Sequence, residues 1–133
     1  MEVIVSRLRS LIRNSYSPYS GFRVASLVVD ENGNMYGGVN IENSSYGLTM
    51  CAERVAVFNA IASGARRIRR VYIGTEVSPP APPCGACLQV ISEFGDADTE
   101  IILVSLKTGE TIKYKLEDLL PVRFHGSYIG GVD

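Results

Sequence analysis

The sequence contains no tryptophan, a single histidine and three cysteines among its 133 residues. An odd number of cysteines, too few for the disulfide framework of a small secreted domain, favours reduced thiols with a metal-binding or catalytic role. An excess of one charge is also missing, since 13 Lys and Arg residues face 14 Asp and Glu residues. The chain therefore lacks the basic excess that drives binding to phosphate backbones, and we expect no nucleic-acid partner.

Long hydrophobic segments are absent as well. No run of about 18 uninterrupted apolar residues occurs, so we expect no association with a membrane. Glu2 and Arg7 interrupt the start of the sequence too early for the apolar core of a signal peptide, which leads us to expect a cytoplasmic protein. A length of 133 residues with 46% hydrophobic residues suits one globular domain, spanning 1–133.

Hydrophobic periodicity and turn residues predict the order α-β-β-α-β-α-β-β, followed by a short helix. The Asn32-Gly33 dipeptide is typical of a tight hairpin, so the first two strands should be antiparallel. The last two strands should also be antiparallel, because their connection is too short for a parallel crossover. We therefore predict an α/β fold with a mixed five-stranded sheet. The predicted helices span 3–14, 49–63, 84–94 and 116–120. The predicted strands span 22–29, 71–74, 100–106 and 111–115, and a further strand after the turn at 30–34 runs through about residue 41.

Two local features of the predicted elements have specific interpretations. We expect Thr49 to be the N-cap of the second helix, and the apolar face of that helix to be formed by Val55, Phe58 and Ala62. The four arginines between 66 and 70 flank a short strand. They are compatible with a nucleic-acid patch, but a solvated sheet edge is the better interpretation in a chain of formal net charge −1.

The cysteines all fall at the predicted starts of the two central helices. Cys84 and Cys87 are three residues apart, so on a helix they project from nearly the same side and can share one metal ion with Cys51. A helix N-terminus favours the thiolate form. Thiolate ligands favour Zn²⁺, and three protein ligands leave one position open, as in catalytic sites. His125, far along the chain and without ligand-like spacing, is a weak candidate for a fourth ligand.

Two charged residues follow Cys51 closely. Glu53 lies near the helix start, where its carboxylate can act as a general acid and base at the metal. The alternative is a carboxylate that merely complements the helix dipole. Zn²⁺ with three thiolates leaves an excess of negative charge, so positive groups are needed nearby. We expect Arg54 to donate to a thiolate, the alternative being an ordinary surface arginine.

Residues 51–54 (Cys-Ala-Glu-Arg) and 83–87 (Pro-Cys-Gly-Ala-Cys) match the two halves of the zinc-dependent deaminase signature in its three-cysteine form. Over nearly its full length the chain resembles the small homotetrameric cytidine deaminases, with further matches at 16–22, 39–43 and 119–121. The resemblance implies a three-layer α-β-α fold with one Zn²⁺ per subunit. It also implies hydrolytic deamination of cytidine and deoxycytidine to uridine and deoxyuridine in pyrimidine salvage, with release of ammonia.

The resemblance further implies roles for individual residues. Cys51, Cys84 and Cys87 would bind zinc. Glu53 would carry a proton from the zinc-activated water to N3 of cytosine and then to the leaving amine. Asn40 and Glu42 would hydrogen-bond the ribose hydroxyls. Phe22 would line the base pocket, and the backbone of Ala52 would contact the pyrimidine edge. Phe124 would reach the site of a neighbouring subunit, and Tyr46 would act across a subunit interface.

Each of these matches has a plainer alternative. Phe22 is compatible with a core position, Asn40 and Glu42 with a network at a strand end, and Phe124 with ordinary packing of the tail. Leu88 departs from the family, which commonly has arginine after the last cysteine, and residues 24–27 (Val-Ala-Ser-Leu) replace a more usual Val-Gly-Ala-Ala. Two other functions stay open: deamination of another aminopyrimidine, of blasticidin S or of polynucleotide cytosine, and a closed structural zinc module.

Overall fold

A computed structural model of the chain describes residues 1–131. Its centre is a five-stranded sheet in the order β2-β1-β3-β4-β5, in which β3 and β4 are parallel and the other neighbours are antiparallel. The strands are β1 (Val24–Asp30), β2 (Met35–Val39), β3 (Ile68–Thr75), β4 (Glu100–Ser105) and β5 (Thr111–Lys115). The helices are α1 (Glu2–Ile12), α2 (Ala52–Ala62), α3 (Gly85–Phe94) and α4 (Leu116–Leu119), with short 3-10 helices η1 (Tyr46–Leu48) and η2 (Gly126–Ile129).

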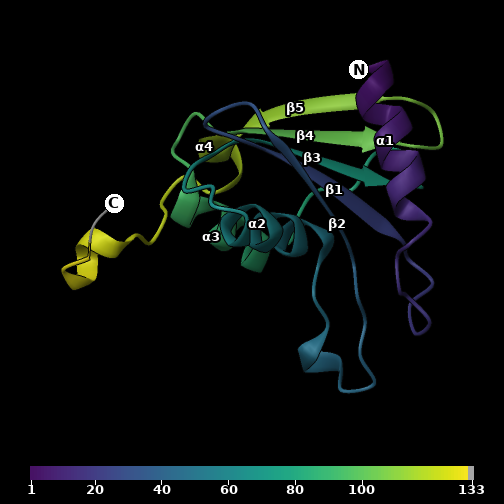
Figure 1. The fold of residues 1–133 in the computed structure, drawn as a ribbon, viewed down its shortest axis with the longest axis horizontal. Helices are drawn as coiled ribbons and strands as arrows, with labels where there is room; N and C mark the ends of the chain where they lie inside the picture. The colour runs from purple at the N-terminus through teal and green to yellow at the C-terminus, as the bar shows by residue number, and fades with distance from the viewer. Residues whose placement is uncertain (132–133) are drawn as a thin grey trace.

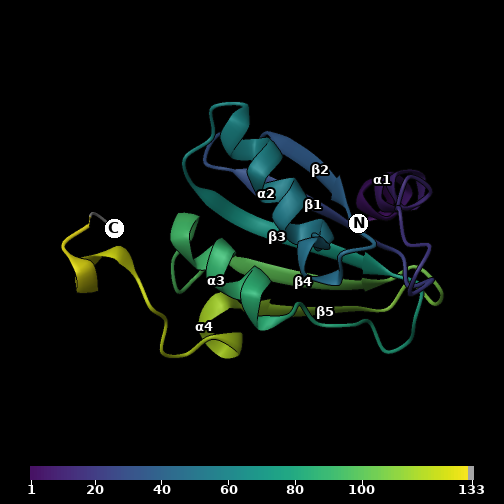
Figure 2. The same ribbon diagram turned by 90° about the horizontal axis from the view of Figure 1, so that it is seen from below.

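Helices cover both faces of the sheet, which confirms the predicted three-layer α-β-α arrangement. Helices α2 and α3 lie together under one face (Figures 1 and 2). Helix α1 packs on the other face through Ile4, Leu8 and Ile12. Side chains alternate between the two faces of a strand, so Tyr72 joins the core under α1 while its neighbours Val71 and Ile73 join the core under α2 and α3. Among residues 1–131, no helix has the length and apolar character needed to cross a membrane.

The start of α2 differs from the prediction. The N-cap is Cys51, not Thr49, and the helix begins at Ala52. The reason is a contact distant in sequence: Met50 and Ile41 form an antiparallel bridge, and the Thr49 hydroxyl accepts a hydrogen bond from the backbone N–H of Asn43 at 3.2 Å. These contacts keep residues 49 and 50 extended, so the helix starts later than capping preferences indicated. The predicted strand end near 41 was also too late, because β2 ends at Val39.

The apolar face predicted for α2 was wrong. Val55 is partly exposed, Ala62 is exposed, and Phe58 is 46% exposed. The buried residues of this helix are Ala52, Glu53, Ala56, Val57 and Ala60. Small side chains let the helix lie directly on β2.

Gly38 of β2 shows how close this approach is. A Cβ atom built on Gly38 would lie 2.4 Å from the backbone nitrogen of Ala56 and 2.6 Å from the carbonyl oxygen of Ala52. Real Cβ atoms essentially never make such contacts, so β2 and α2 meet backbone to backbone. This contact sets the position of the first turn of α2.

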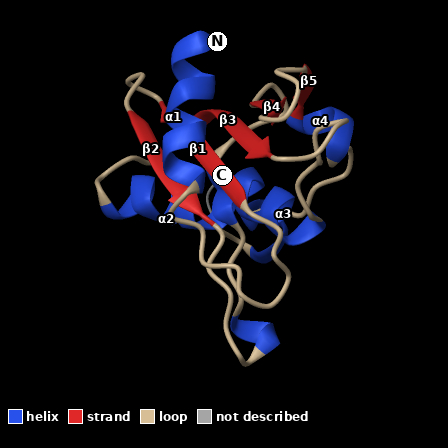
Figure 3. Cartoon of the chain, turned by 90° about the vertical axis from the view of Figure 1, so that its right-hand side faces the viewer, coloured by secondary structure: helices blue, strands red, loops and turns tan. Residues whose placement is uncertain are grey.

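Two segments project from the layers. The chain between β2 and α2 forms a long loop that carries η1 and extends away from the sheet (Figures 1 and 3). The tail after α4 carries η2 and extends in a different direction, to the left in Figures 1 and 2. Both segments expose large apolar side chains: Ile41, Tyr46 and Leu48 on the loop, and Val122, Phe124, Tyr128 and Ile129 on the tail.

Candidate active site

The three cysteines occupy the N-termini of the two helices under the sheet. Cys51 is the N-cap of α2, Cys84 is the N-cap of α3, and Cys87 lies in the first turn of α3. Neither N-cap makes a side-chain hydrogen bond to its helix. The free N–H groups and the positive end of the dipole at both helices therefore favour negative charge on the sulfur atoms.

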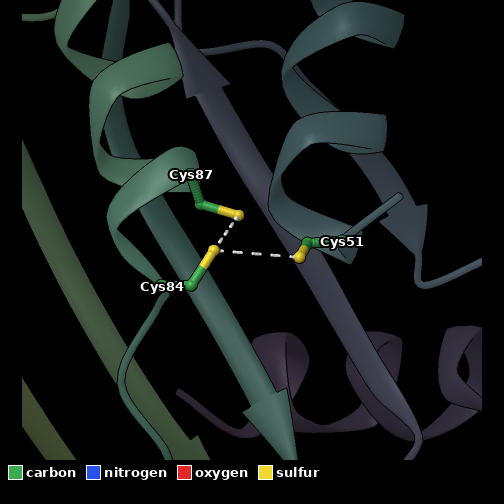
Figure 4. A group of neighbouring side chains, drawn as sticks. All are labelled: Cys51, Cys84 and Cys87. Carbon is green, nitrogen blue, oxygen red and sulfur yellow. Dashed lines mark hydrogen bonds between the residues drawn. The ribbon is translucent and has the colours of Figure 1, made fainter. Parts of the chain in front are cut away.

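The sulfur atoms form a compact group (Figure 4). The Sγ atoms of Cys51 and Cys84 are 3.9 Å apart, those of Cys84 and Cys87 are 3.4 Å apart, and all three lie within 4.8 Å of one another. Zn–S bonds of about 2.3 Å in a tetrahedral site place sulfur atoms about 3.8 Å apart. The donor set and its spacing thus fit one zinc ion.

The cluster is closed toward the protein and open toward solvent. Cys87 is buried, Cys51 is partly buried and Cys84 is exposed. Among residues 1–131, no His, Asp or Glu joins the three cysteines in a common metal-binding group. His125 instead lies in the tail, against Ser127 and Tyr128. With three protein ligands, a tetrahedral ion keeps one position for water or substrate, as in catalytic zinc sites.

A thiolate is already favoured in the cluster without a metal. The pKa of Cys51 is lowered to about 5, first because the Cys87 thiol hydrogen-bonds to it and also because Arg54 lies beside it. The same hydrogen bond, together with burial, raises the pKa of Cys87. The Arg54 guanidinium donates from Nη2 to the Cys51 sulfur at 3.5 Å, while its buried Nε has no hydrogen-bond partner among residues 1–131. Arg54 is therefore partly buried and directed at the sulfur of Cys51.

Glu53 is buried beside these sulfur atoms, with 4% of its surface exposed. Burial raises the pKa of its carboxyl group, and the negative charge of Cys51 raises it further. Its own backbone N–H and the Cys87 thiol act in the opposite direction. A carboxyl group with a raised pKa next to an open metal position is suited to accept and return a proton near neutral pH.

Leu88, where a second cation would be expected from related sequences, is buried in the core under α2 and α3. Within the described residues, the one cationic side chain with a hydrogen bond to a cysteine of the cluster is Arg54. The positive charge that offsets the thiolates thus comes from this arginine and from the two helix N-termini.

Asn40 and Glu42 hold the segment that precedes β1. Asn40 Nδ2 donates to the carbonyl oxygen of Phe22 at 2.7 Å, and its Oδ1 accepts from the N–H of Val24 at 2.9 Å and from the hydroxyl of Ser15. The network at a strand end, which the sequence left as an alternative, is therefore present for Asn40. One amide hydrogen of this side chain is free for a further partner.

The Glu42 carboxylate is similarly engaged. Its Oε1 accepts from the N–H groups of Tyr19 and Ser20 at 2.9 and 3.1 Å, and its Oε2 accepts from the Ser20 hydroxyl. This hydroxyl is the main reason that the pKa of Glu42 is lowered. Glu42 also lines a concavity together with Tyr19, Ser20, Tyr46 and Thr49. Sequence reasoning missed the part played by Ser20, although it lies inside the matching segment 16–22.

The remaining predicted site residues differ in exposure and in the contacts that they make. Phe22 is exposed just before β1, and Ala52 is fully buried as the first residue of α2. Tyr46 is 75% exposed on the projecting loop and packs edge-on against Tyr19. Phe124 is 56% exposed, stacks on Tyr128, and accepts a hydrogen bond at its carbonyl from Gln89 of α3. The neighbouring Arg123 also donates a hydrogen bond to α3, at the carbonyl oxygen of Ser92, so this part of the tail lies against α3 of its own chain.

Comparisons with known proteins agree with this geometry. Residues 2–103 match the model of the cytidine and deoxycytidylate deaminase zinc-binding region. The chain is 42% identical over 110 residues to a cytidine deaminase of Halalkalibacterium halodurans, covering 83% of each chain. It is 37% identical over 124 residues to a cytidine deaminase of Sporosarcina psychrophila, covering 93% of this chain and 90% of that one. The crystal structure of a cytidine deaminase from Burkholderia pseudomallei superposes with a TM-score of 0.86 at 36% identity, covering 92% of this chain and 98% of that one.

The fold and the three-cysteine site define a zinc-dependent hydrolytic deaminase, with a donor set that fits one zinc ion per subunit. More specifically, the chain belongs to the cytidine and deoxycytidylate deaminase family.

Proposed function

We propose that the protein deaminates the free nucleosides cytidine and deoxycytidine, and that it does so in the cytoplasm as part of pyrimidine salvage, with residues 1–133 acting as one domain. The reaction adds water at C4 of the base, expels the amino group as ammonia and leaves uridine or deoxyuridine. The observation that carries the proposal is a buried carboxyl group, Glu53, beside three clustered thiols with an open fourth position. The names of the similar proteins support cytidine as substrate.

In this proposal Cys51, Cys84 and Cys87 hold the zinc ion. When bound, zinc supplies a Lewis acid that makes water nucleophilic at neutral pH. Arg54 stabilises the thiolate of Cys51 and so limits the negative charge that reaches the ion.

Glu53 moves the protons of the reaction. Its carboxylate takes a proton from the attacking water and delivers it to N3 of the base, which removes electron density from C4 and favours attack there. The same carboxyl group then takes the proton of the hydroxyl group newly bonded to C4 and delivers it to the amino group, which leaves as ammonia as the C4 carbonyl forms. Burial keeps Glu53 away from bulk water, so the proton is returned to the substrate.

The nucleoside is held by residues on the two sides of the cysteine cluster. Phe22 packs against the base, and the backbone of Ala52 contacts the pyrimidine edge. Asn40 donates its second amide hydrogen to a ribose hydroxyl. Glu42 accepts from a ribose hydroxyl through the remaining lone pairs of its carboxylate. Their existing bonds to residues 15–24 fix both side chains before the substrate arrives, which reduces the entropy lost on binding.

We further propose that the active form is a homotetramer. Exposed apolar side chains are concentrated on the projecting loop and on the tail, including Tyr46 and Phe124. Apolar patches of this kind mark interaction surfaces. Phe124 would reach the nucleoside site of a neighbouring subunit, and Tyr46 would pack across an interface. Sedimentation should give a tetramer, whereas a fully active monomer would contradict the proposal.

The decisive experiment is Glu53→Gln with zinc quantitation and an ultraviolet deamination assay. The variant should retain about one zinc ion per chain and lose at least about a hundredfold in kcat, since general acid and base catalysis contributes about 10²–10⁴. Near-normal turnover would reject the mechanism. Comparing cytidine and deoxycytidine with free cytosine, blasticidin S and single-stranded DNA tests the substrate class. A zinc-loaded wild-type protein inactive on every substrate would favour a structural zinc module.

A further inference from the structure

A concave, basic site lies at the end of α1, among residues that the deaminase chemistry does not use. Its cations are Arg9 in the last turn of α1, Arg13 at the C-cap of that helix, Arg23 just before β1, and Lys107 shortly after β4. Together with Glu76 they surround a cavity of about 370 Å³, which we call the basic pocket. It lies at the carboxyl ends of β3 and β4, whose arrowheads point toward α1 (Figure 1).

The charge of the basic pocket is unbalanced. It contains four cations and one carboxylate, although the whole chain carries a formal net charge of −1. Among residues 1–131, the side chains of Arg9, Arg13 and Lys107 make no ion pair or hydrogen bond with the protein. Three positive charges around one cavity therefore lack a counter-charge from the chain.

The fourth cation, Arg23, is fixed in orientation by an ion pair with Glu76. Arg23 Nε donates to Glu76 Oε1 at 2.9 Å, and Nη2 donates to Oε2 at 2.6 Å. This bidentate pair fixes the plane of the guanidinium group, and the two N–H donors on Nη1 stay free. Ile12 and Leu106, which also line the pocket, are buried apolar side chains. An apolar floor weakens solvent screening and strengthens the attraction of an anion.

Two of the cations lie together at the C-terminal end of α1. Arg9 and Arg13 are four residues apart on the helix, so their side chains are neighbours of like charge. The negative end of the α1 dipole compensates part of this repulsion. It does not account for Arg23 and Lys107, which reach the same cavity from two other segments.

The arginine-rich region that the sequence singled out is different. Its concavity contains Arg67, Arg69 and Arg70, but it also contains four acidic residues, Glu31, Asp96, Asp98 and Glu100. Arg70 is paired with Glu100. The most visible basic cluster in the sequence is thus neutralised by the fold, and it offers no comparable anion site.

We propose that the basic pocket binds an anion with two or more linked phosphate groups. Four converging cations exceed what a single carboxylate needs, and planar guanidinium groups match phosphate oxygens with paired hydrogen bonds. The cavity volume is in the range of small-ligand sites. Inorganic polyphosphate and the phosphate chain of a nucleotide share this chemistry.

The test is isothermal titration of the zinc-loaded enzyme with inorganic tripolyphosphate and, separately, with a nucleoside triphosphate. The double variant Arg13→Gln/Lys107→Gln should weaken binding at least about tenfold, because each charge-assisted contact contributes substantially to affinity. The matched control is Arg7→Gln/Arg69→Gln, which removes the same charge outside the pocket. It should change binding less than about twofold, and both variants should retain wild-type deamination.

The two titrants identify the source of the phosphates. Equal affinities mean that the phosphate chain alone is recognised, and tighter binding of the nucleotide means that its base or sugar also makes contacts; both support the proposal. Metal extraction by tripolyphosphate affects all variants alike, so the comparison between variants is decisive. Equal binding by the wild-type protein and the pocket variant overturns the proposal. Binding of a single-stranded oligonucleotide at this pocket without binding of tripolyphosphate overturns it too.

Discussion

Replacing Gly38 by alanine tests whether backbone contact between β2 and α2 positions the catalytic helix. The new Cβ would lie 2.4 Å from Ala56 N, 2.6 Å from Ala52 O and 2.9 Å from Ala56 Cα. These are backbone atoms that cannot rotate away, so relief requires α2 to move by about 1 Å in a tightly packed interior. Overpacking of this kind costs about 3 kcal/mol, which lowers the melting temperature of a domain of this size by about 10 °C.

The neighbouring glycine provides the control. A Cβ on Gly37 would meet Leu11 Cδ2 at 2.9 Å and Leu11 Cδ1 at 3.5 Å, and these are the far ends of a flexible, partly exposed side chain. Gly37→Ala should therefore cost less than about 1 kcal/mol. Thermal unfolding by circular dichroism at one protein concentration gives the stabilities. Zinc content should fall in Gly38→Ala, because α2 begins at a cysteine of the cluster. Equal melting temperatures for the two variants would refute the reasoning.

Three further predictions concern single side chains. Arg54→Gln should weaken zinc retention about tenfold against a competing chelator, because it removes the hydrogen bond to the Cys51 thiolate; unchanged retention would show that the helix N-termini suffice. Ser92→Ala should leave stability unchanged or raise it, since the buried Ser92 hydroxyl has no hydrogen-bond partner in the described part of the chain; a loss above about 1 kcal/mol in urea unfolding would contradict this. Glu100 has a lowered pKa because of Lys113 and then Arg70, so its stabilising effect is present above the ordinary carboxyl pKa and disappears as the pH falls through the lowered value. Glu100→Gln should therefore flatten the decline in melting temperature between about pH 5 and pH 3, and an unchanged slope would count against it.

The parts of the structure that the sequence predicted correctly depend on local geometry. Spacing of three between Cys84 and Cys87 at a helix start determines their relative position, and the short connection between β4 and β5 requires an antiparallel pair. The start of α2 was predicted wrongly because it depends on the bridge between Ile41 and Met50, which are distant from any capping signal. Phe58 was misplaced because an alanine surface, not the largest side chains, packs on β2.

The basic pocket could not be predicted from the sequence, for a different reason. Its cations come from α1 and from the flanks of β1 and β4, and no two of them form a recognisable motif. By contrast, the arginines at 66–70 are close together in the sequence and so suggest a basic patch. Acidic residues from other segments neutralise them. Charged residues that are distant in sequence come together only when the chain folds. The sequence alone therefore reveals charge clusters formed by neighbouring residues, but not those formed by the fold.

Cys51 and Cys84 are the N-caps of α2 and α3, and within the described residues neither cap makes a side-chain hydrogen bond to its helix. Binding of zinc therefore also ties together two helix starts that the chain leaves uncapped. Metal supply then controls more than whether the enzyme can turn over. Removal of zinc should therefore loosen the first turns of both helices, which hydrogen exchange of their backbone amides would measure.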